Sequence, residues 1–338
     1  MKLLTAAVPC YNSQDYMRRA VESLLLGGDR MEILIVDDGS ADQTGRIADE
    51  YARAYPGRVR ALHQPNMGHG GAVMTGLQNA SGLYFKVLDS DDWVDADALR
   101  KLLDALETLA AAPLPPDLLV SNYIYDKAGV RHKHTVRYGN VLPEGRVLSW
   151  ADVGRFRMGQ YILMHAAVYR TALLRGCGLS LPRHTFYVDN LFVYVPLIKV
   201  ETLFYLNVDL YHYYIGREGQ SVQEANMLRR IDEQLRVNRL MLEAVDLSRA
   251  GDKRKRRYMR GYLGIVTTIS SVLLERAGTR ESLEKKKCLW DTIRENAPDD
   301  YLALRWRPMG VAVHLPGRLG RGVTLSAYRL SRRIYGFN

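Results

Sequence analysis

The 338-residue sequence has few cysteines, no long apolar run and no internal repeat. Its cysteines, Cys10, Cys177 and Cys288, are odd in number and lack any paired spacing. That pattern argues against a disulfide framework or a structural zinc site and predicts a reducing, cytoplasmic environment. The longest later apolar stretch, residues 261–274, is interrupted by Thr and Ser and is shorter than the ~20 residues that span a bilayer. We therefore expect no transmembrane helix, and the short apolar run ending at Val8 predicts a first strand rather than a signal peptide.

Acidic residues are missing from the end of the chain. Residues 301–338 contain seven Arg and no Asp or Glu. Residues 1–250 hold 28 Lys+Arg and 29 Asp+Glu, a net of −1, whereas residues 251–338 hold 19 and 8, a net of +11. A basic tail on a neutral body favours an anionic partner, either a membrane or a nucleic acid, and the alternatives are a solvated basic face or an oligomer contact.

The first half of the sequence alternates short apolar runs with segments of helical periodicity. Such a βαβαβαβα series predicts an α/β fold with an open, mostly parallel sheet flanked by helices. From residue 226 onward the pattern is mainly helical, so we expect one domain over residues 1–225 and a basic helical region over residues 226–338. The expected strands are residues 2–9, 31–40, 59–64, 82–92 and 118–126, and the expected helices are residues 13–26, 41–55, 70–80 and 95–112, the first with Ser13 as its N-cap.

Acidic residues follow the expected strands directly. Asp37 and Asp38 end one apolar run, and Asp89, Asp91 and Asp92 end another. Parallel sheets bind ligands at the carboxyl ends of their strands, and unpaired buried carboxylates are costly, so a positive partner is expected there. Two carboxylates in an Asp-Ser-Asp triplet can face Mg²⁺ or Mn²⁺, which prefer oxygen ligands and share their shell with substrate phosphates. The alternative for Asp91 or Asp92 is helix N-capping.

These motifs in combination resemble glycosyltransferase family 2, which has the GT-A fold. The resemblance rests on "VPCYNSQDYMRRAVESLL", "EILIVDDGSADQT" and "NMGHGGAVMTGLQNASGLYFKVLDSDDWVD", and it continues more loosely to about residue 225. It implies a nucleotide-sugar donor, most often a UDP-sugar, held through Mn²⁺ or Mg²⁺, and transfer with inversion at the anomeric carbon. The acceptor expected by analogy is a glycan or a lipid-linked molecule of cell-surface polysaccharide synthesis.

The resemblance also assigns roles to individual residues. Asp38 corresponds to the acid that meets the base, with Asp37 beside it toward the ribose, and Asp89 and Asp91 correspond to the metal ligands. Many family members have an Arg at the start of the helix that contains Gly70 and Gly71, but here the equivalent stretch reads "AVMTG". Lys86 or Arg217 is therefore expected to supply the missing positive charge. The remaining donor-binding positions implied are Pro9, Tyr11, Asn12, Gly70, Gly71 and Ser90.

A later motif, "YVDNLF", resembles the family's acidic motif with Val188 where Glu is usual. In the family its aspartate, here Asp189, is the general base that accepts the proton of the acceptor hydroxyl. The alternative is that Asp189 caps a helix. "YHYYIGREGQSV" resembles the segment that closes over the donor and contains Arg217, and His165 and His212 are expected to be packed histidines.

Other function classes fit the sequence less well. A sugar nucleotidyltransferase should carry a Gly- and Arg-rich loop with a Lys after its first strand, and "VPCYNSQDY" has none. A nucleic-acid-binding protein would not explain acids at successive strand ends, so no nucleic acid is expected. A catalytically inactive relative that acts as a binding module stays an alternative. With a lipid-linked acceptor, the basic tail predicts a cytoplasmic enzyme located peripherally on the inner face of the membrane.

Overall fold

The protein is described here by a computed structural model that covers residues 2–127, 129–130, 133–157, 159–216 and 223–335. The chain divides into two compact units, Met1–Ile215 and Gly216–Asn338. The boundary expected near residue 225 falls ten residues beyond this division. Each unit is described by itself.

The first unit is built on one ten-stranded mixed sheet with the order β3-β2-β1-β4-β9-β6-β10-β5, and β7 and β8 pair with β6 and β10. Strands β1–β4, β6 and β10 run in one direction and β5, β7, β8 and β9 run against them, so the expected open, mostly parallel sheet is confirmed. The strands are β1 (Leu4–Cys10), β2 (Met31–Asp37), β3 (Val59–His63), β4 (Tyr84–Val87), β5 (Trp93–Val94), β6 (Leu118–Lys127), β7 (His134–Val136), β8 (Val147–Ser149), β9 (Ala167–Arg170) and β10 (Thr202–Ile215).

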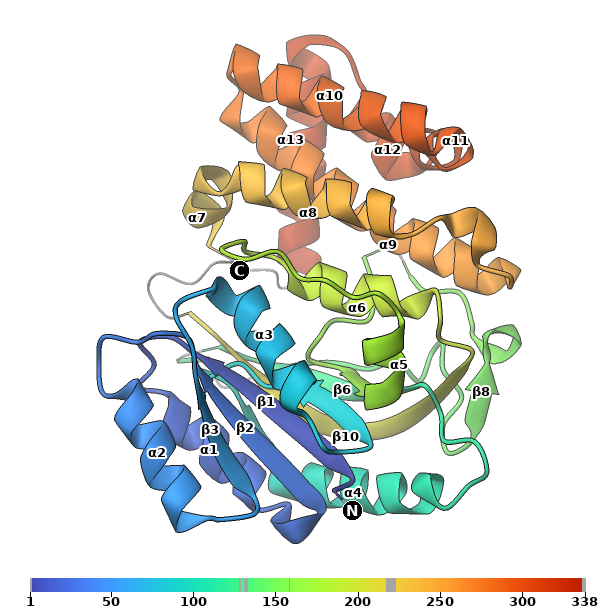
Figure 1. The fold of residues 1–338 in the computed structure, drawn as a ribbon. Helices are drawn as coiled ribbons and strands as arrows, with labels where there is room; N and C mark the ends of the chain where they lie inside the picture. The colour runs from blue at the N-terminus through green and yellow to red at the C-terminus, as the bar shows by residue number, and fades with distance from the viewer. Residues whose placement is uncertain (1, 128, 131–132, 158, 217–222, 336–338) are drawn as a thin grey trace. The chain divides into compact units, whose positions relative to one another are not determined.

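Helices cover both faces of this sheet, which is why every residue of β1 and β2 is buried. Figure 1 shows α4 on one side of the sheet and α3, α5 and α6 on the other. The helices of the first unit are α1 (Met17–Leu25), α2 (Thr44–Ala54), α3 (Gly68–Asn79), α4 (Ala96–Ala110), α5 (Thr171–Gly176) and α6 (Asp189–Leu197).

Two helix starts differ from the expectation. Helix α1 begins at Met17 with Tyr16 in the N-cap position, so the predicted cap at Ser13 is wrong. The Ser13 carbonyl instead accepts the Tyr16 and Met17 amides in a turn. The Ser13 hydroxyl lies 2.9 Å from the Ser90 hydroxyl. Helix α4 is capped by Asp95, whose side chain accepts the Ala98 amide, so neither Asp91 nor Asp92 has the capping role.

All regular elements in the described residues of the second unit are helices, as the periodicity after residue 226 predicts. Its central helix is α9, capped at its start by the Asp252 side chain and ended by Gly278 in the left-handed conformation at φ 67°. Among the described helices, none combines the length and hydropathy required to cross a lipid bilayer. The helices are α7 (Glu224–Arg229), α8 (Ile231–Ala244), α9 (Lys253–Ala277), α10 (Arg280–Asn296), α11 (Pro298–Arg305), α12 (Pro308–Ala312) and α13 (Gly317–Tyr335).

Candidate active site

The acidic residues meet at one edge of the sheet because β1, β2, β3 and β4 are parallel neighbours. Cys10 pairs with Asp37, and Asp37 pairs with His63, so these strand ends are level with one another. Strand β4 ends at Val87 beside Ala7 of β1, and the turn that follows carries Asp89, Asp91 and Asp92. The topology, rather than any local preference, therefore gathers the motifs that lie far apart in the sequence.

Asp89 is bound by a histidine that the sequence analysis missed. His69, in the first turn of α3, places Nε2 2.8 Å from Asp89 Oδ1. Burial opposes the charge of His69, but the hydrogen bond to Asp89 and the nearby carboxylates of Asp189 and Asp91 raise the pKa of the imidazole above its usual value. The one available signal was that His69 is the only ionisable residue in the segment "NMGHGG".

The same partners keep Asp89 ionised. Burial acts to raise its pKa, but the hydrogen bond from His69, the charge of His69 and the charge of Lys86 bring the pKa of Asp89 below the usual aspartate value. In the described part of the chain no hydrogen bond reaches its second oxygen, Oδ2. Asp89 therefore offers a charged oxygen atom that the protein itself does not use.

Asp92, although only three residues away, faces the interior. Its side chain accepts the Tyr211 hydroxyl at 2.5 Å on Oδ2 and the Tyr214 amide at 2.8 Å on Oδ1. Burial, followed by the charges of Asp91 and Asp89, raises the pKa of Asp92 well above the ordinary aspartate range. With both oxygens occupied and the carboxyl buried, Asp92 is a poor metal ligand.

Lys86 does not reach the open side of the site, which corrects its assignment as a donor-binding residue. The side chain is 1% exposed, and Nζ donates to the His165 carbonyl at 2.7 Å. Burial lowers the pKa of this ammonium to about 7 even though Asp89 and Asp92 favour its charge. Lys86 lies beneath the carboxylates, where it offsets their charge from the interior.

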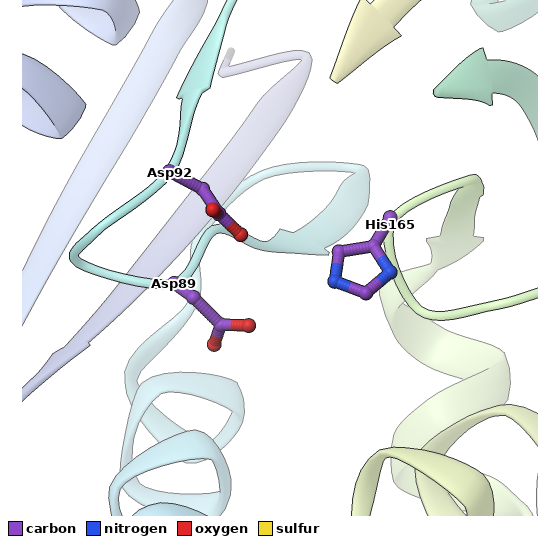
Figure 2. Close-up of side chains that lie close together, drawn as sticks. All are labelled: Asp89, Asp92 and His165. Atoms are coloured by element: carbon purple, nitrogen blue, oxygen red, sulfur yellow. The ribbon is translucent and has the colours of Figure 1, made fainter. Parts of the chain in front are cut away.

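His165 completes a cluster with two of the acids. Figure 2 shows Asp89 and Asp92 on the turn after β4 with His165 opposite them, and one ligand atom of each lies within 4.8 Å of the others. The ring of His165 stacks on Tyr213 at a centroid distance of 4.3 Å, and its Nδ1 has no hydrogen-bond partner among the described residues. Burial lowers the pKa of His165 to about 4, so the ring is neutral. His212 stacks on Trp93, so both histidines are packed, as expected.

Asp189 is the first residue of α6, whose N-cap is Val188. It does not itself cap the helix, so the capping alternative is wrong. Burial raises the pKa of Asp189 to about 6, with His69 lowering it and Asp89 raising it. Asp189, His69 and Asp89 affect one another's pKa because the fold brings them near one another, although a hundred residues separate Asp189 from Asp89 in the sequence.

Comparisons with known proteins agree with this geometry. The profile of Glycosyl transferase family 2 matches residues 5–170. An uncharacterized glycosyltransferase of Mycoplasma pneumoniae, the MG025 homolog, is 30% identical over 224 residues, which are 65% of this chain and 70% of that protein. The chain belongs to glycosyltransferase family 2.

Two further comparisons show how much of a relative the chain covers and which solved structure has a similar fold. The putative glycosyltransferase EpsH of Bacillus subtilis (strain 168) is 29% identical over 228 residues, which cover 62% of this chain but only 59% of EpsH. The crystal structure of S. aureus TarS 1-349 in complex with UDP-GlcNAc has a TM-score of 0.68 at 20% identity and covers 99% of this chain and 91% of TarS 1-349. At that identity the likeness shows a shared GT-A fold.

The first family 2 motif forms the rim of the site. Pro9 is a buried residue of β1, whereas Tyr11 is 54% exposed just beyond the strand. Asn12 has φ 48°, and its side chain accepts the Ala41 amide at 2.9 Å, so it joins the loops after β1 and β2. Ser90 is fixed by Ser13. Tyr11 is thus the member of this motif that offers a free ring surface.

The second family 2 motif is buried. Asp37 contacts His63 Nδ1 at 3.0 Å and accepts the Ser40 amide at 3.1 Å. Asp38 is 2% exposed, and its Oδ1 accepts from Gln64 Nε2 at 2.6 Å and from the Met67 amide at 2.8 Å. Asp38 thereby anchors the loop that leads into α3. Both of these bonds reach Oδ1, and no hydrogen bond from the described residues reaches Asp38 Oδ2.

The glycines of α3 are needed for packing. A Cβ on Gly70 would lie 2.8 Å from the Pro182 carbonyl oxygen, and one on Gly71 would lie 2.4 Å from Met67 Cβ. Gly70 lets α3 approach the segment before Asp189, and Gly71 leaves room for the Met67 side chain at the start of the same helix. The remaining predicted donor-binding residue, Arg217, lies outside the described residues.

Proposed function

We propose that this chain is an inverting glycosyltransferase that moves a sugar from a nucleotide-sugar, specifically a UDP-sugar, to a hydroxyl group of a glycan or a lipid-linked acceptor in cell-surface polysaccharide synthesis. The observation that carries the proposal is the position of His69. It is hydrogen-bonded to Asp89 after β4 and electrostatically coupled to Asp189 at the start of α6. A donor-binding acid and a candidate base thus share one site.

The nucleotide is assigned to the sheet edge bordered by Tyr11, Asn12 and the loop that Asp38 anchors. A base stacked on the exposed Tyr11 ring would gain buried aromatic area without competing with a protein contact. Support for a uridine nucleotide comes from TarS, whose crystal structures contain UDP-GlcNAc and UDP.

A divalent cation, Mn²⁺ or Mg²⁺, fits the acids at the open side of the turn. Asp89 is ionised and has an oxygen unused by the protein, and Asp91 is two residues away with a partly exposed side chain. Asp92 is excluded because both of its oxygens accept protein hydrogen bonds. We assign Asp89 and Asp91 as the ligands. A bound cation would neutralise the diphosphate and so improve it as a leaving group.

Asp189 has the chemistry expected of a general base. A carboxylate whose pKa is raised to about 6 is still mostly ionised at neutral pH and is a stronger proton acceptor than an ordinary aspartate. Asp189 would take the proton of the acceptor hydroxyl while the oxygen of that hydroxyl bonds to the anomeric carbon. The bond from that carbon to the diphosphate breaks on the opposite face, which inverts the configuration.

His69 is proposed as the residue that positions Asp89. Its hydrogen bond holds Oδ1, which directs Oδ2 toward the cation, in the manner of outer partners that orient metal ligands. His69 also supplies part of the positive charge that an arginine at the start of α3 would provide. From the sequence alone, this charge is expected at Lys86 or Arg217 instead.

A donor screen tests the proposal. The full chain would be heated with UDP-glucose, UDP-galactose, UDP-GlcNAc, GDP-mannose and UDP, each with Mn²⁺ or with chelator, and the melting temperature recorded. We expect stabilisation by UDP compounds in the presence of Mn²⁺, followed by slow release of UDP from the matching donor because water can replace the acceptor. Binding without any release or transfer would indicate the inactive binding module, and absence of binding to every nucleotide would contradict the proposal.

A further inference from the structure

Large apolar side chains that face solvent are concentrated in one short part of the second unit. Of the twelve such residues in the described chain, half lie between residues 302 and 323. Leu319 is 88% exposed and Trp306 is 71% exposed. The six are Leu302, Trp306, Val311, Leu315, Leu319 and Val323. Such a cluster marks an interaction surface, whereas apolar residues scattered singly are ordinary.

The six residues form three pairs, each with members four positions apart. Trp306 donates its amide to the Leu302 carbonyl at 3.3 Å, so this pair lies on one face at the end of α11. Leu319 and Val323 lie one turn apart on α13, and the residues that follow each of them, Gly320 and Thr324, are buried about 100° further around the helix. Each of these helices therefore keeps one face inside the unit and presents an apolar strip to solvent.

Arginines accompany the apolar strips, although α11 also carries an exposed carboxylate, Asp299, three residues before Leu302. The Arg305 guanidinium lies 5.1 Å from the centroid of the Trp306 ring, and Arg321 lies between Leu319 and Val323 in sequence with a partly exposed side chain. Residues 301–338 contain seven Arg and no Asp or Glu. A surface of this charge is complementary to phosphate-rich headgroups and repels a basic partner.

We propose that the Leu302–Val323 surface, defined by these six apolar residues together with Arg305 and Arg321, docks the enzyme on an anionic lipid bilayer. Leucine, valine and tryptophan side chains would enter the boundary between headgroups and acyl chains, while the arginines stay at the level of the phosphates. None of the described helices can cross a bilayer, so the attachment is peripheral and reversible. This inference goes beyond the proposed sugar transfer and does not depend on it.

A lipid surface suits these side chains better than the other anionic partners do. A nucleic acid is bound mainly by basic groups with aromatic rings that stack on bases, whereas five of the six exposed apolar residues here are aliphatic. A fluid bilayer accommodates separate apolar strips without the shape complementarity that a protein interface requires. The surface would hold the enzyme where a lipid-linked acceptor is found.

Vesicle sedimentation with the full chain tests the inference. Phosphatidylcholine vesicles with and without phosphatidylglycerol would be compared, and the bound fraction measured against salt. We expect binding to the anionic vesicles that weakens as salt rises, because screening acts over about 8 Å at physiological ionic strength. Leu319→Ser with Val323→Ser should lower the partition coefficient at least about tenfold. Arg305→Gln and Arg321→Gln should each lower it about fivefold.

The matched control is Leu114→Ser, which removes a leucine that is 83% exposed in the first unit and should leave binding unchanged. Circular dichroism and donor hydrolysis should be the same for all variants, so a loss of binding cannot be attributed to misfolding or to a failed active site. Equal binding by the wild type and the double variant would overturn the proposal. The proposal would also be overturned if the wild type bound no vesicles and instead self-associated or was retained on DNA, and if the same substitutions abolished that behaviour.

Discussion

The hydroxyl group of Tyr211 lies 2.5 Å from Oδ2 of Asp92 and also accepts the Asp89 amide at 3.2 Å. One side chain of β10 thus holds both ends of the acidic turn that follows β4. This contact turns Asp92 into the interior. Asp89 is left as the acid at that turn with a charged oxygen unused by the protein.

Removing this hydroxyl should loosen the turn. Tyr211→Phe leaves a buried carboxyl group without its strongest partner, so we expect the free energy of unfolding to fall by about 1–3 kcal/mol. Denaturant unfolding measures it. The matched control is Tyr213→Phe on the same strand, for whose hydroxyl the described residues provide no hydrogen bond. An equal loss in both variants would show that the Tyr211–Asp92 contact has no special weight.

Metal dependence should follow from Asp89 and Asp91. Asp91→Asn replaces a charged oxygen by a neutral amide, so donor turnover should fall at least about a hundredfold and excess Mn²⁺ should restore part of it. Chelator should abolish turnover by the wild type. Asp29→Asn, at a carboxylate that is 96% exposed, is the control and should behave as wild type. Full turnover with chelator present would refute the metal assignment.

Asp189→Asn should still bind the nucleotide-sugar but transfer the sugar about 10²–10⁴ times more slowly, since the acceptor hydroxyl loses its general base. Because the base must be ionised and burial raises the pKa of Asp189 to about 6, the wild-type kcat should decline as the pH falls below about 6. The variant should lack that acidic limb. Rapid transfer by Asp189→Asn would move the role elsewhere, with Glu218, outside the described residues, the next residue to test.

His69→Ala should weaken Mn²⁺ binding about 10–100-fold, the usual cost of losing a group that orients a metal ligand. Tryptophan fluorescence during a Mn²⁺ titration measures the affinity directly, without reference to turnover. His69→Gln keeps a donor near Asp89 Oδ1 and should recover part of the affinity. His134→Ala, at an exposed histidine that contacts Tyr125, should leave it unchanged. Unchanged affinity in His69→Ala would remove the positioning role.

The sequence by itself determined the local structure and the outline of the site. Apolar runs such as that of β2 and the helical periodicity after residue 226 depend on neighbours within a few residues, so their pattern can be read directly. The acids could be placed at one edge because the carboxyl ends of parallel strands must meet there. Helix boundaries were less certain, as Ser13 shows, because a turn that ties Ser13 to Ser90 competes with a cap.

Only the tertiary structure decided which acid keeps an oxygen free of protein hydrogen bonds and which faces the core. Asp89, Asp91 and Asp92 are chemically equivalent in the sequence, and Tyr211, more than a hundred residues later, determines that Asp92 is buried. Tertiary packing also gave His69 and Lys86 different positions. His69 reaches Asp89 from α3, whereas Lys86 is buried and donates to the His165 carbonyl. Such contacts depend on how distant segments pack, and local periodicity has no information about them.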